Sequence, residues 1–264
     1  MKLSFIPKAS QKRISTVGNY NIMVDCFDLP YNGRQYIYIQ QEPESVIPYR
    51  DHLLKNWNLY YKIYTYDNIL LQNCPNAIKY VFGTSTFKSF FEISNLNISK
   101  KLFQISSLTG DKEQLIGHKL RKTLYKNKSL FPNNFIFFVS HSAKTLDITD
   151  QTPKIYGTKL PLFETFQFSI IIECSQQINY FSEKLIDCLL TRTIPIYWGC
   201  PNINEYFDTS GWIFFNDLDI LEKEITSEHY SKYTNTIEDN YHKSLHYANI
   251  LKNLERAGLS SNSQ

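Results

Sequence analysis

A pattern suited to phosphate binding lies where a polar loop meets a predicted helix. Ser182 is a good helix N-cap, and Glu183 and Lys184 follow it in the first turn. The first backbone N–H groups of a helix have no partner within the helix, so they bind phosphate oxygens readily. Lys184 opposes the helix dipole, a cost that a bound anion removes. The alternative is that Lys184 is simply solvated.

Two more side chains at this helix start suit a sugar or a nucleotide. The carboxylate of Glu183 can accept hydrogen bonds from sugar hydroxyls, and Tyr180 can pack against a ribose or a base. Spacing alone does not identify the ligand. The chain contains no Gly-x-Gly-x-x-Gly pattern, no Walker loop and no His-Glu-x-x-His pattern.

The elements around this pattern form one structural unit. Residues 166–173 are apolar and β-branched, which is typical of a buried strand, and residues 194–198 form a second such run. Between them come a polar loop at 174–181 and an amphipathic helix at 182–192. This order predicts a βαβ unit with parallel strands and a right-handed crossover. Ligands of such sheets bind beyond the carboxyl ends of the strands, where the loop lies.

Shorter signals elsewhere extend the same alternation. We expect a domain boundary near residue 95, where Ser and Asn gather in a stretch of mixed composition. Helices are predicted at 46–57 and 117–126, and further strands at 36–39, 60–65, 78–82, 102–107 and 135–139.

Charge and cysteine usage exclude several classes of protein. The 28 Lys and Arg exceed the 25 Asp and Glu by only three and are scattered, so no nucleic-acid partner is expected. The five cysteines form no Cys-x-x-Cys pair, which argues against a metal site and a disulfide framework. No apolar run approaches the roughly 18 residues of a membrane helix. We expect a cytoplasmic protein without a membrane span, at most peripheral to a membrane.

The stretch from residue 168 to 201 resembles the donor-site signature of the α1,3-fucosyltransferases, glycosyltransferase family 10. The family pattern is an apolar strand, Glu-Asn-Ser, a spacer, Tyr-x-[Thr/Ser]-Glu-Lys, an amphipathic helix and Pro-[Ile/Val]-Tyr-[Trp/Leu]-Gly-x-Pro. Here these motifs are matched by Glu-Cys-Ser at 173–175, Tyr-Phe-Ser-Glu-Lys at 180–184 and Pro-Ile-Tyr-Trp-Gly-Cys-Pro at 195–201. The match continues through Asn202-Ile203 and a strand at 212–215.

The resemblance implies a role for each matching residue. Tyr180, Glu183 and Lys184 would hold the GDP part of GDP-fucose, with Glu183 at the ribose and Lys184 at a phosphate. Arg121 stands at the place of the family's diphosphate-binding arginine, a role that suits a planar fork of donors. The alternative for Arg121 is a surface residue of an ordinary helix.

One departure from the family pattern bears on the donor sugar. Glu173 and Ser175 match the family's donor-binding motif, but Cys174 replaces an amide between them. A thiol hydrogen-bonds weakly, so the sugar pocket of this chain can differ from that of the family.

The resemblance also implies a catalytic base. Glycosyl transfer with inversion needs a carboxylate that takes the proton of the acceptor hydroxyl. The family's Glu follows an early strand, and here the strand at 36–39 leads to Glu42, with Glu44 as the substitute and His141 as the next candidate. Both acids could instead be solvated loop residues.

The fold implied is α/β, a GT-B glycosyltransferase with two Rossmann-like halves facing a cleft. Residues 1–95 would form the acceptor half, 96–250 the donor half and 251–264 a tail. Few residues precede the strand leading to Glu42, so the N-terminal half is expected to be shortened.

The implied function is transfer of fucose, or a related sugar, from a GDP-sugar to a glycan hydroxyl. The GDP-sugar is a substrate, and neither a metal nor another cofactor is required. The alternatives are a transferase for another nucleotide sugar and a non-catalytic nucleotide- or glycan-binding module.

Overall fold

A computed structural model describes the protein at residues 14–17, 19–29, 33–87, 93, 96, 98–144, 146, 148 and 151–259. The chain divides into two compact units. The first comprises residues 1–82, 178–180 and 249–264, and the second comprises 83–177 and 181–248. The boundary predicted near residue 95 falls in a stretch that is mostly outside the described residues, and the sequence-based domain limits stay a prediction.

The first unit is built on a five-stranded sheet in the order β1-β2-β3-β4-β5. β1 and β2 are antiparallel, and the other neighbours are parallel. The strands are β1 (Ile14–Val17), β2 (Tyr20–Val24), β3 (Gln35–Ile39), β4 (Tyr60–Thr65) and β5 (Ala77–Lys79), and the helices are α1 (Arg50–Asn56), α2 (Asn68–Asn73) and α8 (Ile250–Arg256).

Aromatic and aliphatic side chains from strands and helices fill the core of the first unit. Tyr38 and Ile63 of the sheet pack with Tyr49, Leu53 and Leu70, and all five are fully buried. The helix predicted at 46–57 begins only at residue 50. Pro48 disfavours a helical backbone at the preceding residue, and residues 43–47 form a turn instead.

The second unit is built on a six-stranded parallel sheet in the order β11-β10-β9-β6-β7-β8. Counted along the chain within this unit, the order is 3-2-1-4-5-6, the doubly wound order of dinucleotide-binding sheets. The order reverses between β6 and β9, which is the topological switch point. The strands are β6 (Leu102–Thr109), β7 (Phe135–Ser140), β8 (Lys154–Ile155), β9 (Phe166–Ile172), β10 (Ile194–Trp198) and β11 (Ile213–Phe214).

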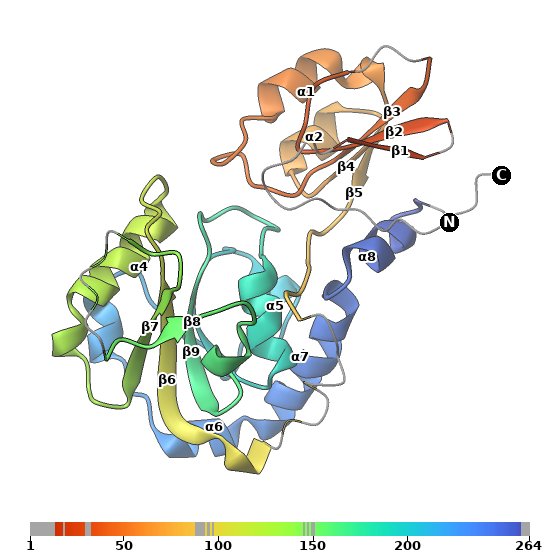
Figure 1. Ribbon diagram of the computed structural model, residues 1–264. Coiled ribbons are helices and arrows are strands. Elements are labelled where there is room, and N and C mark those ends of the chain that lie inside the picture. The colour runs from red at the N-terminus through yellow and green to blue at the C-terminus, as the bar shows by residue number, and fades with distance from the viewer. Residues whose placement is uncertain are drawn as a thin grey trace. The chain divides into compact units, whose positions relative to one another are not determined.

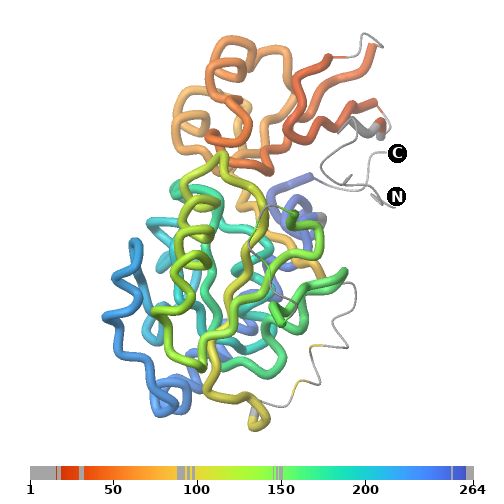
Figure 2. Tube along the Cα trace, turned by 60° about the vertical axis from the view of Figure 1, so that its left-hand side comes forward, coloured from red at the N-terminus to blue at the C-terminus, as the bar shows by residue number. Residues whose placement is uncertain are grey.

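Helices cover both faces of the second sheet. α4 and α5 lie on opposite faces (Figure 1), as right-handed crossovers that leave the switch point in opposite directions require. In Figure 2 the tube climbs through β6, turns at the carboxyl end of the strand and returns as α4. The helices are α4 (Ile116–Lys126), α5 (Glu183–Leu190), α6 (Ser227–Lys232) and α7 (Thr234–Tyr247).

The βαβ unit β9–α5–β10 forms as predicted. β9 and β10 pair in parallel with Ile170 opposite Ile196, and both residues are buried. The side chain of Ser182 accepts a hydrogen bond from the Lys184 N–H and so caps α5. At the other end, Arg192 has a positive φ of 57°, which turns the chain sharply into β10.

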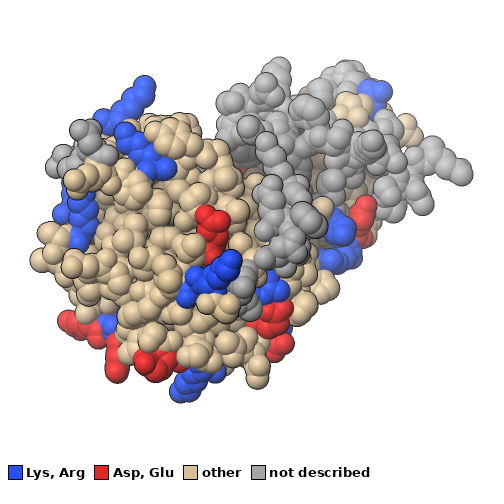
Figure 3. All heavy atoms as spheres, turned by 60° about the horizontal axis from the view of Figure 1, so that its bottom comes forward, with Lys and Arg blue, Asp and Glu red and all other residues tan. Residues whose placement is uncertain are grey.

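The predicted α/β fold class is confirmed in each unit, since both contain parallel strands joined by helices. None of the helices in the described part of the chain is long and apolar enough to cross a membrane. On the face that Figure 3 shows, acidic and basic side chains are scattered, and neither sign covers a continuous area.

Candidate functional site

A pocket of about 330 Å³ opens at the switch point of the second sheet. Its walls come from the carboxyl-terminal parts of β6 and β9, from α4 and from the loop before β9. This is the place where doubly wound sheets bind ligands. Its lining residues are Leu108, Thr109, Gly110, Lys112, Arg121, Ser140, Lys159, Leu162, Phe163, Ser169, Ile170, Ile171, Ile172 and Lys184.

Four cationic side chains line this pocket: Lys112, Arg121, Lys159 and Lys184. Three of these charges affect the neighbouring His118. Burial and the positive charges of Arg121, Lys112 and Lys184 together lower the pKa of His118 to about 4. A pocket with an apolar floor and several cations suits a ligand with more than one negative charge.

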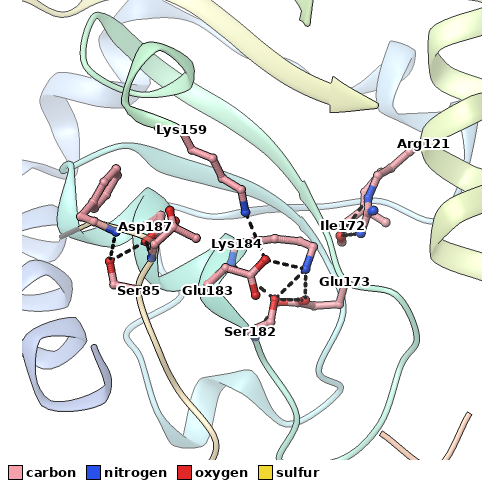
Figure 4. Close-up of polar contacts among 11 residues, drawn as sticks. Ser85, Arg121, Lys159, Ile172, Glu173, Ser182, Glu183, Lys184 and Asp187 are labelled. Carbon is pink, nitrogen blue, oxygen red and sulfur yellow. Dashed lines mark hydrogen bonds and ion pairs between the residues drawn. The ribbon is translucent and has the colours of Figure 1, made fainter. Parts of the chain in front are cut away.

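A glycine on α4 sets the position of Arg121. A Cβ at Gly117 would lie 1.8 Å from the Glu173 carbonyl oxygen, and the Gly117 N–H donates to the Cys174 carbonyl at 3.1 Å. The helix therefore touches the end of β9 backbone to backbone. One turn later Arg121 lies on the same side of α4 and donates through Nε and Nη2 to the Ile172 carbonyl (Figure 4).

Glu173 is fully buried and closes the amino-terminal end of α5. Its Oε1 accepts from the Ser182 N–H at 2.9 Å, and its Oε2 accepts from the Ser182 hydroxyl at 2.6 Å. Two amides expected to be available for phosphate are therefore occupied, those of Ser182 and Lys184. Within the chain the Glu173 carboxylate positions the helix start, and its predicted role in donor binding stays a prediction.

Glu183 lies between two lysines. Its Oε1 is 3.1 Å from Lys159 Nζ and 3.1 Å from Lys184 Nζ (Figure 4). Burial alone would raise the pKa of Glu183, but the two ammonium groups outweigh it and hold that pKa well below its usual value. Burial likewise lowers the pKa of Lys184, whereas Glu183 and Glu173 raise it, and the net shift is upward. Both side chains are therefore charged at neutral pH.

Asp187 fixes the middle of α5 to the segment at residues 85–86. Its carboxylate accepts from the Ser85 hydroxyl at 2.7 Å and from the Thr86 N–H and hydroxyl at 3.0 and 2.5 Å (Figure 4). Burial raises the pKa of Asp187 to about 6, while Lys159 and the hydrogen bonds act against that shift. The helix that carries Glu183 and Lys184 is thus fixed at its start and in its middle.

Ser175 and Cys174 follow Glu173 at the end of β9. Cys174 is buried. The Ser175 hydroxyl oxygen is also buried and has no hydrogen-bond partner among the described residues. A buried hydroxyl of this kind is suited to a polar ligand group.

Glu42 and Tyr180 belong to the first unit and are described there. Glu42 lies in the loop after β3, as predicted, and its side chain is half-buried. Glu44 Oε2 accepts from the N–H of Arg50, the first residue of α1, at 3.1 Å. Tyr180 is buried, with its ring centroid 5.7 Å from that of Tyr66. The other predicted residues, Arg121, Glu173, Ser175, Glu183 and Lys184, all belong to the second unit.

Two of the pocket cations, Lys112 and Lys159, were not predicted from the sequence. Lys159 follows β8 on the loop at the carboxyl edge of the sheet, but a strand of two residues is too short to recognise from its pattern. Within the described residues, no group of His, Cys, Asp and Glu is arranged to hold a metal ion.

The chain resembles known proteins in sequence over part of its length and in fold over most of it. No family model matches the chain. Over 90 residues, 34% of its length, the chain is 32% identical to the α-(1,3)-fucosyltransferase FucT of Helicobacter pylori. The chain is similar to the α1,3-fucosyltransferases. The aligned part spans only 18% of the Helicobacter enzyme.

Solved structures show the likeness in fold. A crystal structure of an α1,3-fucosyltransferase matches 94% of this chain and 79% of its own, with a TM-score of 0.51 at 16% identity. A second α1,3-fucosyltransferase structure, which contains GDP, matches 91% of this chain and 78% of its own, with a TM-score of 0.50 at 14% identity. The resemblance inferred from the residues is thus confirmed, as is the GT-B type of fold.

Proposed function

We propose that the chain is a glycosyltransferase that moves fucose, or a related sugar, from a GDP-sugar to a glycan hydroxyl with inversion. The observation that supports this most is the convergence of Arg121, Lys159 and Lys184 on one pocket at a Rossmann-like switch point. The likeness in fold to an α1,3-fucosyltransferase whose crystal structure contains GDP supports the choice of GDP as the nucleotide. The proposed site of action is the cytoplasm.

The donor roles follow from charge and position. Arg121 and Lys184 would bind the diphosphate, and Lys159 adds a third cation at the same pocket. Glu183 would accept from the ribose hydroxyls, because its carboxylate stays ionised between the two lysines. The cations would stabilise the negative charge that develops on the leaving diphosphate, so the proposal needs no metal.

The chemical step is a single displacement at the anomeric carbon. The acceptor oxygen forms a bond to that carbon while the bond to the diphosphate oxygen breaks, and the electron pair leaves with GDP. Glu42 would take the proton of the acceptor hydroxyl. Tyr180 and Ser175 are proposed as further contacts of the donor.

A second candidate is a transferase for a different nucleotide sugar. Cys174 stands where the resembling family has an amide, and it is buried beside the Gly117 contact. Its smaller, weakly hydrogen-bonding side chain would change the polar contacts that the end of β9 offers.

Thermal-shift measurements with GDP, UDP and CMP test the proposal. A ligand that binds only the folded chain raises its stability by RT ln(1 + [L]/Kd). We expect a clear shift with GDP and much smaller shifts with UDP and CMP. Equal shifts with all three nucleotides would contradict the GDP assignment, and GDP binding without turnover of any GDP-sugar would favour a binding module.

A further inference from the structure

A buried carboxylate holds the loop that carries Glu42. Asp25 follows β2, and its Oδ1 and Oδ2 accept from the backbone N–H groups of Gln41 and Glu42 at 2.8 and 3.0 Å. The N–H of Asp25 in turn donates to the Ile39 carbonyl at 3.1 Å. Asp25 thus joins the ends of the neighbouring strands β2 and β3, and its carboxylate contacts the Glu42 amide directly.

Asp25 makes these bonds from an uncommon backbone conformation. Its φ is 47°, in the left-handed region, and its exposed fraction is only 8%. This region costs most non-glycine residues about 1–2 kcal/mol, and Asp and Asn adopt it more readily than the others. Such a residue persists where surrounding contacts determine its conformation, and these residues cluster at functional sites.

Other residues brace the rest of the loop. The Gln40 N–H donates to the Tyr64 carbonyl at 2.9 Å, and the Tyr66 hydroxyl donates to the Gln41 carbonyl at 3.2 Å. The Gln40 side chain donates to the Glu42 carbonyl at 3.4 Å. The backbone of Glu42 is therefore held on both sides, whereas its side chain is only half-buried.

We propose that Asp25 is the positioning residue for Glu42, fixing the backbone from which the catalytic carboxylate acts. This inference rests on the proposed function, in which Glu42 is the general base. Two charge-assisted hydrogen bonds from consecutive amides define both the position and the orientation of that backbone. General-base catalysis requires this, since a misplacement of about 1 Å can cost about 100-fold in rate.

Two substitutions separate positioning from folding. Asp25→Gly removes the carboxylate but suits the left-handed backbone, so it introduces no strain. Asp25→Asn also tolerates this conformation and keeps one acceptor. The readout is GDP release, which measures the turnover of GDP-fucose with water as the acceptor. It is measured in both variants, in Glu42→Gln and in the double variant Asp25→Gly/Glu42→Gln.

We expect kcat to fall by about 10-fold in Asp25→Asn and about 100-fold in Asp25→Gly, with KM for GDP-fucose unchanged. The double variant should be no slower than Glu42→Gln alone, because Asp25 acts only through Glu42. A merely structural role would instead multiply the two losses. Hydrogen exchange at the amides of Gln41 and Glu42 should also be faster in Asp25→Gly than in the unaltered chain.

Three results would overturn the inference: multiplied losses in the double variant, unchanged exchange at both amides, or normal kcat in Asp25→Gly while Glu42→Gln is slow. The last result leaves the proposed function standing. If the unaltered chain releases no GDP from GDP-fucose, the proposed function itself fails, and the inference fails with it.

Discussion

Ser182 donates two hydrogen bonds to Glu173, one from its backbone N–H to Oε1 at 2.9 Å and one from its hydroxyl to Oε2 at 2.6 Å. The end of β9 is thereby fastened to the start of α5 across the intervening loop. Lys184 Nζ lies 3.0 Å from the Ser182 hydroxyl and 3.8 Å from Glu173 Oε2. The ammonium group at the pocket is therefore oriented by a buried pair that the ligand does not need to touch.

Replacing Glu173 with Ala should leave two donors of Ser182 buried and unpaired. We expect a loss of unfolding free energy of about 1–3 kcal/mol for each donor, together with weaker GDP binding. Glu173→Gln is the matched control, since its amide can accept from the N–H and donate to the hydroxyl oxygen. Chemical denaturation and GDP titration measure the two effects. A Gln variant of normal stability that fails to bind GDP would show that the charge of Glu173 is needed for binding, beyond its hydrogen bonds to Ser182.

Three of the four pocket cations, Arg121, Lys159 and Lys184, should matter more for GDP binding than a cation outside the pocket. Arg121→Ala and Lys184→Ala should each weaken GDP binding by about 1.5–3 kcal/mol, the range for hydrogen bonds to charged groups. Lys159→Met should weaken GDP binding but leave guanosine binding unchanged, because its proposed contact is a phosphate. Calorimetric titration checks these values, with the exposed Lys119 of α4 replaced by Ala as the control. Equal affinity in all four variants would rule out this pocket.

Gly117→Ala should disturb both stability and binding. The added Cβ would lie 1.8 Å from the Glu173 carbonyl oxygen. Backbone atoms of α4 and of the end of β9 meet there, and neither can move aside as a flexible side chain could. The helix would have to move outward, which costs about 1–3 kcal/mol by the usual measure of overpacking and shifts Arg121. The melting temperature and GDP affinity should both fall. Gly110→Ala is the control for the melting temperature alone, because the nearest atom there would lie 3.8 Å away but Gly110 lines the pocket.

His118 reports the charge of the pocket. Its pKa falls from 6.5 to about 4 on folding, because of burial and the nearby cations. Between these values the unfolded chain binds more protons than the folded one, so His118 favours folding at neutral pH and this contribution is lost as pH falls from 6.5 towards 4. In an NMR titration the pKa of His118 should rise when GDP binds, since phosphate offsets Arg121, Lys112 and Lys184. An unchanged pKa would place the anion elsewhere.

The features that could be predicted from the sequence are mainly those specified by residues close together in the chain. The unit β9–α5–β10 is specified by adjacent signals, an apolar strand, the cap at Ser182 and a second apolar strand, and its bounds agree closely with the prediction. Glu183 and Lys184 could be named as candidate site residues because the family motif is continuous in sequence. β1 and β2 were missed, because short strands without clear turn signals take their identity from pairing.

The parts of the site that were missed depend on tertiary structure. Lys159 reaches Glu183 across 24 residues, and Asp25 reaches Gln41 and Glu42 across 16 and 17 residues. No spacing rule connects such positions. The occupied amide of Ser182 was missed for the same reason, because Glu173 returns to the helix start only when the loop folds back.

The most direct test of the proposed function is the turnover of nucleotide sugars by the unaltered chain. GDP-fucose, UDP-glucose and CMP-sialic acid are each supplied with an oligosaccharide mixture, with EDTA present, and released nucleotide and glycosylated product are measured. We expect GDP and a fucosylated product from GDP-fucose, no product from the other two donors, and a rate about 10²–10⁴-fold lower in Glu42→Gln. Transfer from UDP-glucose or CMP-sialic acid at an equal rate, or no transfer from GDP-fucose, would contradict the proposal.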